Sequence, residues 1–73
     1  MSRQRLEELT KLVDELYLLE GVDVSNLYTC NVNSIKYSNT LREQNFIYSS
    51  LRVRADPSYA SMVQKSTYEL LEE

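Results

Sequence analysis

The first twenty residues carry large hydrophobic side chains at steps of three and four, which is the spacing that lines one face of an α-helix. The pattern predicts a helix over residues 3–20, with Ser2 as its N-cap and Gly21 closing it in the left-handed conformation. Val22 is then expected to fold back onto the last turn. The positions that define the stripe are Leu6, Leu9, Leu12, Val13, Leu16 and Leu19.

Between Ser25 and Ala55 the hydrophobic period drops to two, which is typical of strands with one buried face. Three strands are predicted, joined by tight turns at Asn33-Ser34 and at residues 42–45. The alternating positions are Tyr28, Cys30 and Val32 in the first strand, Ile35, Tyr37, Asn39 and Leu41 in the second, and Ile47, Ser49, Leu51, Val53 and Ala55 in the third.

A second interpretation exists for residues 38–55. Thr40 is followed three residues later by Glu43, and this pair forms the capping box that opens many helices. The strict alternation through residues 51–55 suits a strand better than a helix, so we take the strand as the prediction and keep the helix as its alternative.

Asp56-Pro57 supplies an N-cap followed by proline in the first helical turn, so a last helix is predicted over residues 57–71. The expected fold class is α+β: one small domain spanning residues 1–73, in which a helix, a three-stranded antiparallel sheet and a helix follow one another (αβββα). Both helices cover one face of the sheet, whose strands lie in the order 1-2-3. The expected core is Leu9, Leu12, Val13, Leu16, Cys30, Val32, Ile35, Ile47, Leu51, Val53, Val63 and Leu70.

The composition removes most catalytic chemistry. The 73 residues include no His, one Cys, one Gly and one Pro. The usual general base and the commonest metal ligand are therefore missing, and a glycine-rich phosphate loop cannot form. We expect no enzyme activity, no catalytic residues, no metal and no cofactor.

The single Cys30 suits a reducing compartment, and the charged start of the chain does not look like a signal peptide. No apolar run approaches the roughly 18 residues of a membrane span. A cytoplasmic location and no membrane partner are expected.

The net charge of −3 conceals a basic middle, because residues 24–55 contain four basic side chains and one acidic one. On the predicted sheet, the face away from the helices carries aromatic and basic side chains together. Tyr, Phe and Arg are enriched at the centres of protein interfaces. The residues predicted to bind a partner are Phe46, Tyr48, Arg52, Arg54 and Lys36.

The function predicted from this surface is a non-catalytic macromolecule-binding module, a small adaptor or inhibitor that binds another protein. Self-association is expected as well, since Tyr17, Leu18 and Leu19 add apolar surface that so short a chain cannot bury. The alternative is nucleic-acid binding, in which the same aromatic side chains stack on bases and the same cations meet phosphates.

Two family resemblances concern the layout of elements. The predicted order resembles that of double-stranded RNA-binding domains, but those open the last helix with a run of lysines, whereas residues 57–61 here read Pro-Ser-Tyr-Ala-Ser, and Lys65 stands alone. No RNA binding is inferred from it. The layout, with Met1-Ser2-Arg3-Gln4 beginning an amphipathic helix, also resembles small phage head-completion proteins, although the basic tail of that family is missing. A phage structural role is kept as a further alternative.

Overall fold

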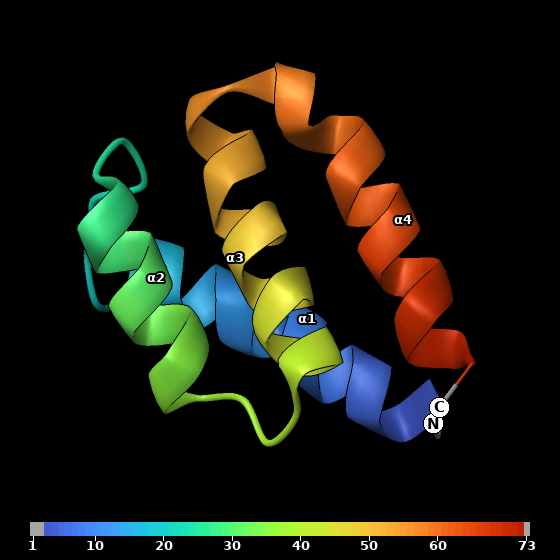
Figure 1. The fold of residues 1–73 in the computed structure, drawn as a ribbon. Helices are drawn as coiled ribbons and strands as arrows, with labels where there is room; N and C mark the ends of the chain where they lie inside the picture. Colours follow the sequence, from blue (N-terminus) through green and yellow to red (C-terminus); the bar gives the residue numbers. More distant parts are fainter. Residues whose placement is uncertain (1–2, 73) are drawn as a thin grey trace.

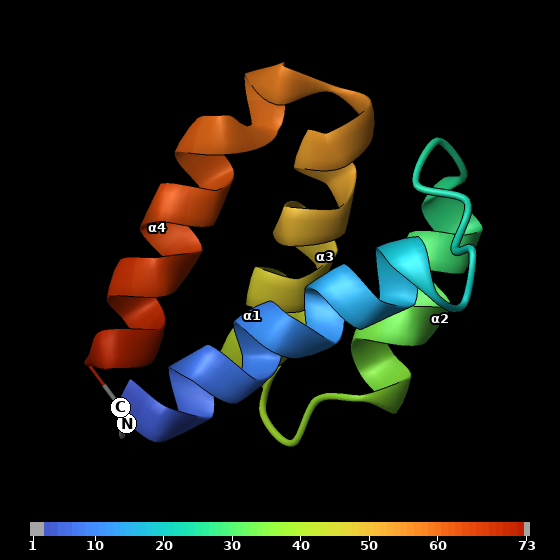
Figure 2. The same ribbon diagram turned by 180° about the vertical axis from the view of Figure 1, so that it is seen from behind.

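The chain folds into helices packed around a central one. The computed structural model describes residues 3–72, and in this range α3 lies in the middle, with α2 and α4 on either side and α1 crossing behind (Figures 1 and 2). The start of α1 and the end of α4 lie close together in both views. The elements are α1 (Arg3–Leu18), α2 (Leu27–Lys36), α3 (Leu41–Ala55), a 3₁₀ turn η1 (Pro57–Tyr59) and α4 (Ala60–Leu71).

The predicted α+β fold is wrong, since residues 3–72 contain helices and no strand. The predicted turn at Asn33-Ser34 lies inside α2, and the one at residues 42–45 lies inside α3. The helical alternative is confirmed for residues 41–55: α3 begins after Thr40, whose hydroxyl accepts a hydrogen bond from the Glu43 N–H (3.2 Å). Asn26 caps α2 in the same way, accepting from the Tyr28 N–H (2.9 Å).

The physical reason for the error is that small polar side chains occupy buried helical positions. On α2 the two buried residues are Cys30 and Ser34, one turn apart. On α3 the buried face includes Ile47, Ser50 and Leu51, again at helical spacing. A buried serine counts as polar in the hydrophobic pattern. The helical period is therefore incomplete in α2 and α3, and an apparent period of two remains.

The two terminal helices were predicted correctly. α1 ends at Leu18, Gly21 takes a φ of +64°, and the Val22 N–H donates to the Leu16 carbonyl (3.1 Å), which turns the chain back onto the helix. The expected Ser2 cap lies outside the described residues. At the other end the Asp56 carboxylate accepts from the Ser58 N–H (3.0 Å), and the first turn of the predicted last helix is the 3₁₀ turn η1.

The core lies where α1, α2 and α4 meet α3. Val32 and Ile35, predicted to be buried, are exposed on the outer side of α2, while Leu12, Val53 and Val63 are half-buried. Phe46, predicted to lie on an open face, is buried because it faces inward from α3. The buried hydrophobic cluster consists of Leu9, Val13, Leu16, Cys30, Phe46, Ile47, Leu51 and Leu70.

Among residues 3–72, no helix has the length and apolar character needed to cross a membrane.

Candidate functional site

The five residues predicted to bind a partner do not come together on one face. They were placed together by the alternation of a strand, and α3 distributes them around a helix instead. Phe46 is in the core, and Tyr48 is half-buried on the side of α3 between α2 and α4. Lys36 lies at the end of α2, with its Nζ 5.3 Å from the centre of the Tyr37 ring.

The two arginines of α3 are engaged within the fold. Arg52 Nη1 donates to the Val24 carbonyl (2.9 Å), and its guanidinium lies 5.1 Å from the centre of the Tyr59 ring. Arg54 forms an ion pair with Asp14 and lies over the Tyr17 ring. Each arginine thus contacts a different segment, and the predicted cations Lys36, Arg52 and Arg54 do not form a row that would follow a phosphate backbone.

A groove between α2 and α3 is lined by one of the predicted residues, Tyr48. We call it the α2–α3 groove. It has a volume of about 490 Å³. Its lining contains no charged side chain and consists of Leu27, Tyr28, Asn31, Gln44, Asn45 and Tyr48.

The helical period of both elements explains why these side chains meet. Asn31 follows the buried Cys30, so it lies at the border of the α2 face that packs on α3. On α3, Gln44 and Tyr48 are one turn apart, and Asn45 lies beside them. The caps at Asn26 and Thr40 set where each helix begins, and through that they set which residues border the groove.

The amide groups of the groove are its most distinctive chemistry. Each amide carries a donor and an acceptor. No hydrogen bond from the side chains of Asn31, Gln44 or Asn45 to any other residue within 3–72 is present, whereas the Asn26 and Asn33 side chains both bond to nearby backbone groups. The groove therefore presents three amides whose bonding capacity is available to a ligand.

A second recess continues the first across Tyr48 and Asn45, which line both. It lies between α3 and α4, has a volume of about 370 Å³ and is bordered by Met62, Lys65 and Glu69. The two recesses therefore adjoin at these two residues of α3.

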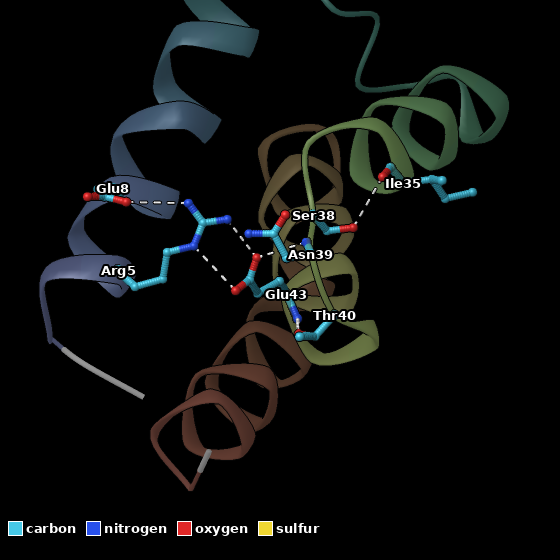
Figure 3. A network of polar contacts seen from close by, with 7 residues as sticks. All are labelled: Arg5, Glu8, Ile35, Ser38, Asn39, Thr40 and Glu43. Carbon is cyan, nitrogen blue, oxygen red and sulfur yellow. Dashed lines mark hydrogen bonds and ion pairs between the residues drawn. The ribbon is translucent and has the colours of Figure 1, made fainter.

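A polar network joins the starts of α1 and α3 but offers no reactive group (Figure 3). Arg5 donates to both oxygens of the buried Glu43 carboxylate, at 2.7 Å from Nη2 and 3.3 Å from Nε. The Asn39 N–H donates to the same carboxylate (3.0 Å). These bonds, chiefly the one from Arg5, hold the pKa of Glu43 below its usual value, so this carboxylate is a charged structural tie.

Neither a metal nor a nucleophile is indicated by the geometry. Residues 3–72 contain no group of three or more acidic, Cys or His side chains that is placed to hold a metal ion. Cys30 is fully buried, its thiol donates to the Val24 carbonyl (3.5 Å), and burial raises its pKa, which disfavours the reactive thiolate.

No family model matches the sequence, and neither a curated protein nor a solved structure is significantly similar to it. The fold and its grooves therefore carry the functional argument alone. Among the residues that line the groove, the sequence analysis selected Tyr48 and did not select Asn31, Gln44 or Asn45. The signal that could have indicated them is their residue type. Asn is a poor helix former, so an Asn on a helix surface contributes little to the stability of that helix.

Proposed function

We propose that the protein is a non-catalytic protein-binding module whose α2–α3 groove takes a segment of another polypeptide. The observation that supports this most directly is the convergence of Asn31, Gln44 and Asn45, with no bonds from their side chains to described residues, beside Tyr28 and Tyr48.

The groove suits a polypeptide better than a phosphate chain. Amides match the alternating donors and acceptors of a peptide backbone, and tyrosines supply contact area at low conformational cost. A nucleic acid would need cations along the recess to replace its counterions, whereas the lining is uncharged. The arginines that the nucleic-acid alternative requires are engaged with Val24 and Asp14.

A peptide-display experiment tests the proposal. The full chain is immobilised and panned against random dodecapeptides on phage, with counter-selection on an Asn31→Ala, Asn45→Ala variant. We expect peptides that bind the unchanged protein about five- to 150-fold more tightly than the variant, since two lost hydrogen bonds of about 0.5 to 1.5 kcal/mol each amount to about 1 to 3 kcal/mol. Backbone amide resonances that shift on binding should map to α2 and α3.

The control changes one amide and one acidic side chain away from the groove, Gln64→Ala on α4 and Glu72→Ala at its C-cap, and should leave peptide binding unchanged. Peptides that bind the groove variant equally well, or that shift resonances of α1 alone, would contradict the proposal. Tight binding of a single-stranded oligonucleotide that weakens steeply with salt would instead support the nucleic-acid alternative.

A further inference from the structure

The outer side of α2 is an apolar stripe with nothing packed on it. At 3.6 residues per turn, Tyr28, Val32 and Ile35 lie within about 60° of one another, opposite the buried Cys30. Their exposed fractions are 76%, 42% and 54%. α2 packs against α3 with its other side and is the outermost helix on that flank of the molecule (Figures 1 and 2).

We infer that this stripe pairs with the same stripe of a second copy, α2 against α2, about a two-fold axis. The inference goes beyond the proposed function, because the stripe faces away from α3 whereas the groove lies between α2 and α3. Tyr28 borders both surfaces and is left unchanged in the experiments below.

Charge favours a second copy at this place. The chain carries a net charge of −3, so two copies repel wherever their acidic side chains meet. Among the four α-helices described, α2 alone contains no acidic residue, and the nearest acidic residues along the chain, Glu20 and Asp23, lie in the loop before it. α2 is therefore the helix that two copies can bring together with the least repulsion.

The order of residues along α2 suits an antiparallel pairing. Val32 is in the middle of the stripe, with Tyr28 four residues before it and Ile35 three residues after it. A two-fold axis through Val32 places the two Val32 side chains against each other and each Tyr28 against the Ile35 end of the other copy. The basic Lys36 then meets the end of α2 that follows the acidic Asp23.

The available area sets the expected strength. An interface of standard size takes about 800 Å² from each partner, about a sixth of the 4656 Å² surface of this chain. A ten-residue helix is only about 15 Å long, so the stripe alone is smaller than this. Leu18, the last residue of α1, and Leu19 after it are 71% and 80% exposed and offer further apolar surface. A small interface with micromolar dissociation is expected.

Sedimentation equilibrium of the full chain at micromolar concentrations, with charge exchange at the axis, tests the pairing. The unchanged protein should form dimers, and Val32→Glu and Val32→Arg should each be monomeric because two like charges then meet. An equimolar mixture of the two variants should recover dimers. That recovery requires the two residues 32 to lie close together across the interface, as the proposed axis places them.

Tyr68→Glu makes the same kind of change on α4, where Tyr68 is also exposed, and should leave the dimer intact. Circular dichroism checks that each variant keeps its helices. If the Val32 charges disturb the fold, Val32→Cys oxidised with diamide should give a covalent dimer, while Tyr68→Cys should not. A monomeric unchanged protein, dimeric Val32→Glu, or a mixture that stays monomeric would overturn the inference.

Discussion

Glu43 is the residue on which two helices depend. It stands in the first turn of α3, where a negative charge favours the helix dipole, and its buried carboxylate is held by Arg5 from α1 (Figure 3). The backbone N–H of Asn39 completes its shell. One side chain thus closes the start of α3 and fixes α1 across it.

Replacing Glu43 by Gln should lower the free energy of unfolding by about 1 to 3 kcal/mol near neutral pH, because the charged hydrogen bonds to Arg5 are lost. The pKa of Glu43 is lowered in the folded protein, so its stabilisation is fully present above the unfolded pKa of about 4.3. It is lost as the pH falls through the lower folded pKa. Urea unfolding at neutral and acid pH should show the difference between the two proteins shrinking in acid.

Glu8 provides the matched control, since it pairs with the same Arg5 at 3.4 Å but is exposed. Glu8→Gln should change stability by no more than about 0.5 kcal/mol. A Glu43→Gln protein as stable as the unchanged one at neutral pH would show that the buried tie contributes nothing.

At the scale of the elements, α3 and α4 approach each other through serines. Ser49 and Ser66 are both buried, their Oγ atoms lie 3.5 Å apart, and the Ser49 hydroxyl also donates to the Asn45 carbonyl (2.7 Å). Both serines also border the recess between α3 and α4, so a larger side chain at either position has to turn into that recess or move a helix.

A larger residue at the α3–α4 contact should therefore be costly. Ser66→Leu is expected to destabilise the fold by about 1 to 3 kcal/mol through overpacking, although leucine is the better helix former. Ser66→Ala keeps the contact close and should be tolerated to within about 1 kcal/mol. Thermal unfolding of both variants measures this, and a Ser66→Leu protein at least as stable as Ser66→Ala would refute the close contact.

Buried serines also explain which helices could be predicted from the sequence. α1 was predictable because its buried positions, such as Leu9 and Leu16, are hydrophobic. Both terminal helices also carry clear boundary signals, Gly21 after α1 and Asp56-Pro57 before α4. α2 was not, because Cys30 is the only hydrophobe among its buried residues while Val32 and Ile35 face outward. For α3 the capping box at Thr40 was the correct signal, outweighed by alternation beyond Leu51.

The candidate site could be predicted only in part, because it lies on these two helices. Tyr48 was predicted because aromatic side chains mark interfaces in any fold. Asn31, Gln44 and Asn45 meet only when residues 27–36 and 41–55 are helical, so no strand model would bring them together. Arg52 and Arg54 were selected because arginine is common at interfaces. Their contacts with Val24 and Asp14 join segments far apart in the sequence, so a local sequence pattern could not predict them.

For the whole molecule, the helices differ in how firmly they are attached. α1, α2 and α4 each pack on α3, and α2 is the shortest of them. Its buried side contributes Cys30 and Ser34, so little hydrophobic area holds it in place. α2 should therefore open more readily than the rest.

The full burial of Cys30, the single thiol of the chain, makes this opening measurable as a rate of chemical labelling. A disulfide reagent such as dithionitrobenzoate should modify Cys30 only while α2 is detached, and the opening free energy obtained from that rate should be smaller than the free energy of global unfolding from urea. Equal values would mean that α2 leaves only when the whole fold does. If the opening free energy is the smaller of the two, dimer formation through α2 should slow the labelling of Cys30 as the protein concentration rises. The labelling rate of one cysteine would then report both the opening of α2 and the formation of the dimer.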